Sequence, residues 1–588
     1  MRILLLHPED SPEHGPWADE TWDRAVDLGR GGAGTYKRWR EFLRCPAEPL
    51  RTLKLEDFPA VKSAIASGLG RVIDREGLDW WELTAILFHQ RLETLMALQR
   101  FAFGLGAGHQ VFVTRPGIHA DGLRLFLGDR LHCFPAHFSS RNRGLSHYLR
   151  IAFRFKPSQI SQIFWDKFDT AYEVRRRFAA RQRPCLEPVV LLPTAYGNVS
   201  STGIAYADTL PESKFLMVAT RQSGWVVSPP PNVTLKRLAS YAPGNTQNSD
   251  ENTKLDQDWR SLRHDLDSVP EIAMLGRLGF LESFSRLFRT GLGIRDAWRE
   301  VLDREPVRAV LCGDDSNPYT NIPLLLAKMR GLPSLSCHHG AFDGRYVIKK
   351  NHADVILAKG RMEQDYLVRV CGLPASAVEI GAPAQTTSSR SPAKNKATRE
   401  RKYILFLSEY YEVSSGRCEE FYRDVLPSLA DLAVETGRRL VLKLHPFEIR
   451  KDRERLLARI LTPGQRRVTE VVSGRITHDI LLGAWFGITV LSSVTMECAL
   501  LGIPCFLCQW LEFWPYGYID QFGRFGAGRI LESPEQIRQI PQIIEREPVP
   551  VERASDWWQP VSKERLGQLF LGRQLRERAV EDESRAGK

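Results

Sequence analysis

The stretch FGITVLSSVTMECALLGIPCFLC (486–508) decides the fold class of this 588-residue chain. Its first six residues form a mostly apolar run that predicts a buried strand, and a helical pattern follows. That pattern ends at Gly502, with Pro504 just beyond it, which is a common helix stop. A second apolar run, 503–508, begins at once. Two buried strands joined by a helix indicate a parallel pair inside an α/β sheet.

The same alternation of apolar strands and helical patterns recurs along the chain in two series. The expected strands of the first series are 2–6, 110–114, 188–193, 214–219, 308–312, 334–337 and 353–358. Those of the second series are 402–407, 439–444, 467–472, 486–491 and 503–508. A polar stretch rich in Ser, Thr and Lys (385–401) separates the series and is expected to be an interdomain linker. The sequence therefore predicts two doubly wound parallel-sheet domains with a boundary near residue 390.

The expected domain ranges follow from this division. An N-terminal domain is expected over 1–390 and a C-terminal domain over 391–550. The final segment, 551–588, is expected to hold a helix that packs back on the N-terminal domain. The polar stretch 243–258 has almost no apolar residues, so a mobile surface loop is expected there.

The positive charge of the chain is concentrated in one segment, 141–183, which is expected to be a helical insertion. The formal net charge is +11, and this segment holds eleven Lys or Arg residues against three acidic residues. Such a segment can meet an anionic membrane surface, an anionic glycan or a nucleic acid, or it can be a solvated helix face. No RNA- or DNA-binding motif accompanies it, so we expect a peripheral membrane contact and no nucleic-acid partner.

Several features point to a cytoplasmic protein. No run of 18 apolar residues is present, so no transmembrane helix is expected. The apolar start MRILLL (1–6) is too short for a signal peptide. Cys505 and Cys508 lie in an apolar strand and are expected to be core thiols rather than metal ligands, which suits a reducing compartment.

Candidate catalytic residues follow two strands of the first series. Ligands of doubly wound sheets bind outside the carboxyl ends of the strands, so strand-end loops are the place to look. Asp314 and Asp315 follow the strand 308–312, where a carboxylate can act as a general base or simply cap the next helix. His338 and His339 follow 334–337 beside a glycine, and His339 is the stronger candidate for a base or phosphate contact. The alternative for both is a loop histidine bonded to the backbone.

Candidate ligand-binding residues follow two strands of the second series. His445 ends the strand 439–444, and Pro446 restricts it to an extended conformation, which holds the imidazole at a fixed angle. Ser492 and Ser493 precede a helix, where they can cap its N-terminus or form an anion site with its backbone amides. Glu497, in the first turns of that helix, is placed to reach a ribose hydroxyl.

His445-Pro446, followed by Ser492-Ser493, resembles the HP and SS motifs of bacterial sialyltransferases and related transferases of surface polysaccharides. The segment CHHGAFDGRY (337–346) is similar to one in capsule-polysaccharide and teichoic-acid (CDP-glycerol glycerophosphotransferase) enzymes. The resemblance covers roughly residues 305–545. It implies the GT-B fold, in which two Rossmann-like domains face each other across a cleft.

The resemblance also implies site roles. His445, Ser492 and Ser493 would contact the nucleotide and phosphate of a cytidine-activated sugar. Independently of the resemblance, Lys443 is expected to help stabilise the departing phosphate. The acidic motif of the family has two acids before a glycine, whereas here Gly313 precedes the acids, so the base is open among Asp314, Asp315 and His339.

The function expected from the sequence is therefore a metal-independent glycosyltransferase without a cofactor. It would transfer a sugar or glycerol phosphate from a nucleotide-activated donor to a surface or capsular polysaccharide, free or lipid-linked. The alternatives are a non-hydrolysing sugar-nucleotide epimerase of the same fold, or a non-enzymatic protein that binds a glycan or nucleic acid. The basic segment 141–183 and the extra length favour an enzyme with an acceptor site over an epimerase.

Overall fold

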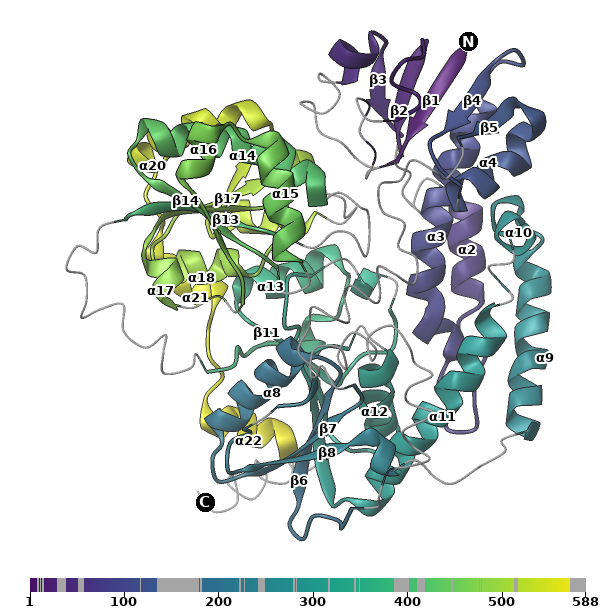
Figure 1. Cartoon of the computed structure of the whole chain (residues 1–588). Coiled ribbons are helices and arrows are strands. Elements are labelled where there is room, and N and C mark those ends of the chain that lie inside the picture. Colours follow the sequence, from purple (N-terminus) through teal and green to yellow (C-terminus); the bar gives the residue numbers. More distant parts are fainter. Residues whose placement is uncertain are drawn as a thin grey trace. The chain divides into compact units, whose positions relative to one another are not determined.

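The structure is a computed structural model of the whole chain (Figure 1). It describes residues 1–571 except for 8–9, 11, 13–14, 29–38, 51–57, 117, 135–178, 180–181, 222–223, 227, 242–248, 279–280, 282, 316–317, 343–344, 348, 385–400, 410–417, 446–447, 475, 477 and 512–516. The basic segment 141–183 lies almost wholly outside the described residues, as does the expected linker 385–401.

The chain folds into two compact units, and each is assembled from three separate segments. Unit 1 comprises Met1–Asp57, Arg91–Arg141 and Thr387–Trp557. Unit 2 comprises Phe58–Gln90, Asn142–Thr386 and Trp558–Lys588. The chain changes unit between residues 386 and 387, next to the expected boundary near 390. The range 1–390, expected as one domain, contributes to both units.

Unit 2 is built on a seven-stranded sheet whose pairings are all parallel, in the order β12-β11-β10-β9-β6-β7-β8. The strands are β6 (Val189–Thr194), β7 (Lys214–Ala219), β8 (Val233–Arg237), β9 (Val307–Cys312), β10 (Ser334–Ser336), β11 (Val355–Ala358) and β12 (Val378–Ile380). The chain runs outward from β6 to β8 and then returns to β9 on the other side of β6. The direction of winding therefore reverses between β6 and β9, which is where such sheets bind ligands.

Unit 1 contains a six-stranded parallel sheet in the order β15-β14-β13-β16-β17-β18. The strands are β13 (Tyr403–Leu407), β14 (Arg439–Lys443), β15 (Thr469–Val472), β16 (Ala484–Thr489), β17 (Cys505–Cys508) and β18 (Arg529–Leu531). Its winding reverses between β13 and β16. Cys505 and Cys508 are buried free thiols in β17, as expected. The predicted α/β class, with two Rossmann-like parallel-sheet domains, is confirmed.

A third sheet, also in unit 1, was not separated from the others in the sequence. It has five parallel strands in the order β3-β2-β1-β4-β5. They are β1 (Arg2–Leu6), β2 (Arg24–Asp27), β3 (Ala47–Pro49), β4 (Gln110–Val113) and β5 (Leu131–Cys133). Its core combines aliphatic strand residues with the buried rings of Trp17, Trp22 and Trp39. The range 1–390 thus holds two sheets rather than one.

A group of helices in unit 2 corrects the expected loop at 243–258. Helix α9 (Ser249–Leu266) covers most of that stretch and lies beside α2 (Pro59–Ser67) and α11 (Ser283–Arg304) (Figure 1). Leu255, Trp259, Leu262 and Leu266 are buried. Their spacing of three or four residues places them on one helix face, and this stripe begins only near the end of the polar stretch.

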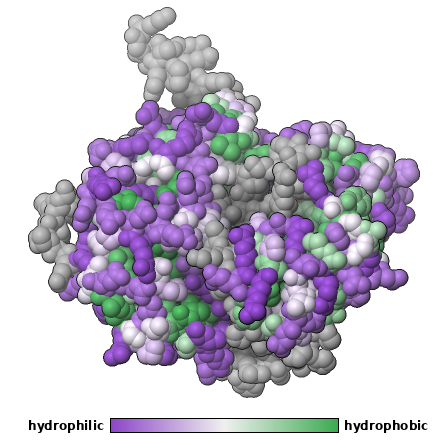
Figure 2. Space-filling view, turned by 90° about the horizontal axis from the view of Figure 1, so that it is seen from above, coloured by the Kyte–Doolittle hydropathy of each residue, from purple (hydrophilic) through white to green (hydrophobic). Residues whose placement is uncertain are grey.

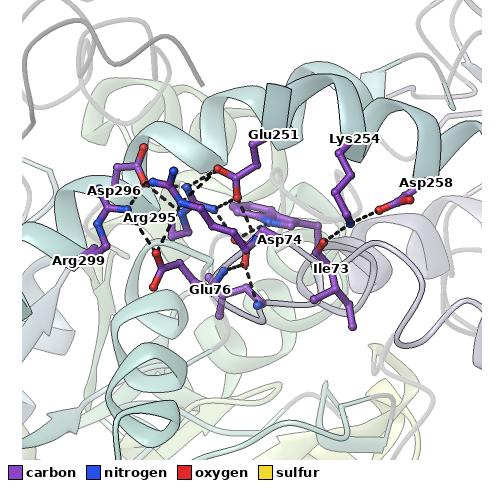
Figure 3. Close-up of polar contacts among 12 residues, drawn as sticks. Ile73, Asp74, Glu76, Glu251, Lys254, Asp258, Arg295, Asp296 and Arg299 are labelled. Carbon is purple, nitrogen blue, oxygen red and sulfur yellow. Dashed lines mark hydrogen bonds and ion pairs between the residues drawn. The ribbon is translucent and has the colours of Figure 1, made fainter. Parts of the chain in front are cut away.

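Buried charge also holds these helices together, as Figure 3 shows. Arg295 of α11 pairs with Asp74 (2.9 Å, loop before α3), with Asp296 (2.7 Å) and with Glu251 of α9. The side chain of Arg295 is fully buried, and α3 (Trp80–Phe103) begins just after the loop. The network therefore ties one loop and two helices of unit 2 to a single guanidinium.

The C-terminal helix packs on the seven-stranded sheet. Leu566, Leu569 and Phe570 of α22 (Lys563–Leu571) share a buried cluster with residues of β6, β7 and β9. Tyr206 of α8 (Gly197–Thr209) belongs to the same cluster. Residues 572–588 lie outside the described part of the chain.

The described surface is mixed in hydropathy, with hydrophilic residues interspersed among apolar ones on the face seen in Figure 2. Within the described residues, the structure has no helix with the length and apolar character needed to span a bilayer.

Candidate functional site

The reversal point of the seven-stranded sheet gathers four side chains from the carboxyl ends of three neighbouring strands. Tyr196 follows β6, Asp314 follows β9, and His338 and His339 follow β10. Gly313 makes the exit from β9 possible, because a Cβ there would lie 2.9 Å from the backbone oxygen of Val199 in α8. We call Tyr196, Asp314, His338 and His339 the β9–β10 cluster.

Asp314 is the centre of this cluster. It is buried, with only 1% of its surface exposed, and its Oδ2 accepts a hydrogen bond from the Tyr196 hydroxyl. Its Oδ1 lies 3.8 Å from Nδ1 of His338. One carboxylate oxygen is thus oriented by a tyrosine while the other faces an imidazole.

The two histidines are held by different contacts. Nε2 of His338 lies 3.0 Å from the backbone oxygen of Ala341, and its ring stacks on Phe342 with centroids 5.0 Å apart. The half-buried ring of His339 meets Tyr196 edge to face at 5.2 Å. The backbone N–H of His339 donates to the oxygen of Gly313 (3.0 Å), which fixes the β10 loop to the end of β9. Sequence reasoning preferred His339, but both rings lie in the cluster.

The carboxylate of Asp315 has different hydrogen-bond and ion-pair partners from that of Asp314. Its Oδ1 accepts a hydrogen bond from the hydroxyl of Tyr346 (2.7 Å), and its Oδ2 lies 3.0 Å from Nζ of Lys349. Lys349 also donates to the backbone oxygen of Asp315 (2.7 Å). Both oxygens of this carboxylate are therefore already engaged, one by a tyrosine and one by a lysine.

The reversal point of the six-stranded sheet holds a residue that sequence reasoning missed. Oε1 of Glu409, which follows β13, accepts hydrogen bonds from Oγ1 of Thr489 (2.5 Å) and from the backbone N–H groups of Val490 (2.9 Å) and Leu491 (2.6 Å). Glu409 thus fixes the segment between β16 and the Ser492-Ser493 pair. Its position directly after an apolar strand was the available signal.

His445 and Lys443 stand at the end of β14. The backbone N–H of His445 donates to Oε2 of Glu448 (2.8 Å). Burial lowers the pKa of the His445 imidazole below its usual value. Nζ of Lys443 donates to the backbone oxygens of Leu444 (2.7 Å) and Gly474 (2.5 Å), and burial lowers its pKa as well. Pro446 lies outside the described residues.

Ser492, Ser493 and Glu497 lie at the start of α18 (Val494–Leu500). The hydroxyl of Ser492 accepts from the N–H of Val494 (3.3 Å), and the N–H groups of Thr495 and Met496 bond to the serine carbonyls. Several amides expected to bind a phosphate are therefore used inside the first turn. Glu497 is exposed on this short helix.

The candidate residues form two groups, one in each unit. Asp314, Asp315 and His339 lie together in unit 2. The remaining candidates lie in unit 1, at or after the carboxyl ends of β14 and β16: Lys443, His445, Ser492, Ser493 and Glu497. Only β13 separates β14 from β16, so the His445 and Ser492 ends of these strands stand roughly 10 Å apart.

Comparison with known proteins adds little beyond this geometry. No family model matches the chain, and no curated protein matches it. Similar solved structures include Staphylococcus aureus MnaA with UDP (12% identity, 65% of this chain, 95% of that one, TM-score 0.39). Others are a glycosyltransferase from Rickettsia africae (9%, 66% and 94%, TM-score 0.38) and the calicheamicin glycosyltransferase CalG4 (14%, 69% and 99%, TM-score 0.37). Likeness at this level carries no argument about activity.

Proposed function

We propose that this chain is a glycosyltransferase that uses a nucleotide-activated donor. The observation that carries the proposal is the β9–β10 cluster: a buried carboxylate and two imidazoles at the reversal point of a doubly wound sheet. Ligands of such sheets bind at this point, and carboxylates and imidazoles are the usual general bases. In the proposed reaction the cluster removes the proton of an acceptor hydroxyl as that oxygen attacks the donor sugar, and the bond from the sugar to the nucleotide phosphate breaks so that the nucleotide leaves.

Within the cluster, Asp314 and His339 are the preferred bases. Asp314 has one oxygen directed at His338, and His339 is half-buried and so more accessible to a substrate. Asp315 is a poorer candidate because a tyrosine and a lysine already engage both of its oxygens.

The donor is proposed to bind along the carboxyl edge of β14 and β16. His445 and the hydroxyls of Ser492 and Ser493 would contact its phosphates, and Glu497 a ribose hydroxyl. Lys443 is proposed to position the loop after β14 rather than touch the donor, because its ammonium group donates hydrogen bonds to two backbone carbonyls.

The finer parts of the proposal rest on the sequence resemblance. They are a cytidine-linked donor, a surface or capsular glycan acceptor, free or lipid-linked, and a cytoplasmic site of action at the inner face of the membrane through the segment 141–183.

The donor is tested by the thermal stability of the full chain with CMP, CDP, UDP and GDP. A ligand at a hundred times its Kd stabilises the native state by about 2.7 kcal/mol. We expect a cytidine nucleotide to raise Tm, and His445→Ala to abolish the rise. His264→Ala, an exposed histidine on α9, is the matched control and should keep it. A preference for UDP would retain the transferase and discard the cytidine donor, while no shift with any nucleotide would contradict the proposal.

The base is tested by kinetics at saturating donor. Loss of a general base lowers kcat by roughly 10²–10⁴-fold. Asp314→Asn or His339→Ala should show this loss with unchanged nucleotide binding, whereas Asp315→Asn should show a smaller one. Full activity in both Asp314→Asn and His339→Ala would refute the assignment.

A further inference from the structure

The β9–β10 cluster has a second chemical capacity. We propose that Asp314, His338 and His339 bind a divalent transition-metal ion, with Zn²⁺ the best-matched, and leave one coordination position open. The proposal rests on the geometry of these side chains and not on the proposed transfer reaction. It departs from the metal-independent scheme expected from the sequence.

Three donor atoms converge at the centre of the β9–β10 cluster. One atom from each of the three residues, two imidazole nitrogens and a carboxylate oxygen, lies within 4.8 Å of the other two. Among the described residues this is the single group of three or more His, Cys, Asp or Glu side chains placed in this way. Donors around a tetrahedral Zn²⁺ stand about 3.3 Å apart, so the 3.8 Å between His338 Nδ1 and Asp314 Oδ1 needs only a slight closure.

The hydrogen bonding of His338 sets its tautomer. Its Nε2 lies 3.0 Å from the backbone oxygen of Ala341, and a carbonyl oxygen can only accept, so the proton sits on Nε2. In the neutral ring Nδ1 therefore carries the lone pair, and it is this atom that faces Asp314. A histidine that ligates a metal through one nitrogen and donates from the other to a carbonyl is the common arrangement in metal sites.

Each donor group is held in place by a contact from outside the cluster centre. The hydroxyl of Tyr196 bonds to Oδ2 of Asp314 and leaves Oδ1 facing inward. Phe342 stacks on His338, and the backbone of His339 is tied to Gly313. Such outer contacts orient the ligands of metal sites.

An ion pair between protonated His338 and Asp314 explains the geometry less well. Charge-assisted hydrogen bonds measure about 2.7–2.9 Å, and the observed separation is 3.8 Å. The ring of His339 lies beside that of His338, with centroids 4.8 Å apart. A cation between the three donors accounts for all of them.

The donor set selects the kind of ion. Two imidazoles and one carboxylate suit Zn²⁺ and its neighbours, whereas Mg²⁺ and Ca²⁺ prefer oxygen ligands. Three protein ligands leave a fourth position for water or a substrate oxygen. A bound ion would also change the part played by Asp314 and His339, from proton acceptors to ligands.

The test is calorimetric titration of the untagged full chain, treated with a chelator and dialysed, with Zn²⁺ and separately with Mg²⁺. We expect one equivalent of Zn²⁺ to bind and Mg²⁺ to bind far more weakly. His339→Ala and Asp314→Asn should each weaken Zn²⁺ binding at least tenfold. Tyr196→Phe, which removes only the hydroxyl, should weaken it by roughly 10–100-fold. His264→Ala is the control for adventitious histidine binding and should match the wild type.

Co²⁺ absorption provides a readout independent of heat, because its visible bands report the coordination sphere. The wild-type bands should disappear in His339→Ala, and His339→Gln serves if the alanine variant does not fold. Failure to bind Zn²⁺ saturably, or equal binding by wild type and all cluster variants, would overturn the proposal. Nucleotide stabilisation through His445 is measured separately, so failure of the metal site and failure of the transferase proposal are distinguishable.

Discussion

Removal of the buried Arg295 guanidinium should destabilise unit 2 strongly. In Figure 3 Arg295 lies among Asp74, Glu251 and Asp296, and its side chain is 0% exposed. Arg295→Met keeps much of the side-chain volume but leaves these carboxylates without their main counter-charge. Loss of one partner from a buried ion pair costs about 3–5 kcal/mol, because the remaining charge is buried and uncompensated. We expect a loss of this size in the free energy of unfolding at pH 7.5.

The effect should depend on pH in a defined direction. Burial acts to raise the pKa of Glu251, but hydrogen bonds and charge from Arg295 and Arg75 outweigh it, so the pKa lies below its ordinary value of 4.5. A carboxyl whose pKa is lower in the folded state stabilises the fold above the unfolded pKa. That stability is lost as the pH falls through the folded value. The difference between wild type and Arg295→Met should therefore narrow below about pH 4.5.

The assay is urea unfolding followed by tryptophan fluorescence. Trp80 is a suitable reporter, because its indole N–H donates to Asp74 (3.0 Å) inside the network. Lys254→Met is the matched control: it lies on α9 of the same unit, its side chain is 60% exposed, and it pairs with Asp258 at 2.7 Å. An exposed pair contributes at most about 1 kcal/mol. Equal stability of the two variants at pH 7.5 would refute the reasoning.

Three further predictions concern other parts of the fold. Glu409→Ala should lower the free energy of unfolding by about 1–3 kcal/mol, because three donors lose their acceptor; a urea midpoint equal to wild type would contradict this. Gly313→Ala should lower the free energy of unfolding by about 1–3 kcal/mol, because its Cβ would lie 2.9 Å from a backbone oxygen. Gly567→Ala, where a Cβ meets open space in α22, should instead raise it by about 0.5–1 kcal/mol. Similar changes in Tm for the two variants would contradict this prediction. Burial, followed by the charges of His119 and Arg115, lowers the pKa of His7 to about 3. Between pH 6.5 and 3 the unfolded state therefore binds more protons than the folded state, so the fold loses stability as the pH falls. His7→Gln should reduce this loss, and a pH profile of stability equal to that of the wild type would contradict the prediction.

Most of the strands that the sequence predicted contain continuous apolar runs, although β10 (SLS) and β15 (TEVV) are short and partly polar. The expected strand 402–407 matches β13 (Tyr403–Leu407), and 308–312 matches β9 (Val307–Cys312). The strands that sequence reasoning missed are three to five residues long and carry polar groups: β2, β3, β5, β8, β12 and β18. They bury little apolar surface by themselves and are specified by the neighbour they pair with, which a local pattern cannot show.

The sequence predicted several residues of the candidate site that lie in loops after the carboxyl ends of apolar strands. The rule that ligands bind at these strand ends identified Asp314 and His339, because each directly follows an apolar strand. It gave no role to Tyr196, whose contact with Asp314 joins residues 118 positions apart. Glu409, bonded to Thr489 across 80 positions, was missed for the same reason. Such pairings depend on the order of strands in the sheet, and that order is set by the tertiary fold.

The packing of α22 has a consequence for how the protein is made. Its residues Leu566, Leu569 and Phe570 complete a buried cluster whose other members include Val190 and Leu311. A ribosome delivers the chain from the N-terminus, so a nascent chain extending only to Trp557 still lacks this cover. Apolar faces exposed during synthesis are prone to association. Unit 2 begins near residue 58, and its buried cluster is complete only once residue 570 has been added, so its apolar faces stay uncovered for most of translation.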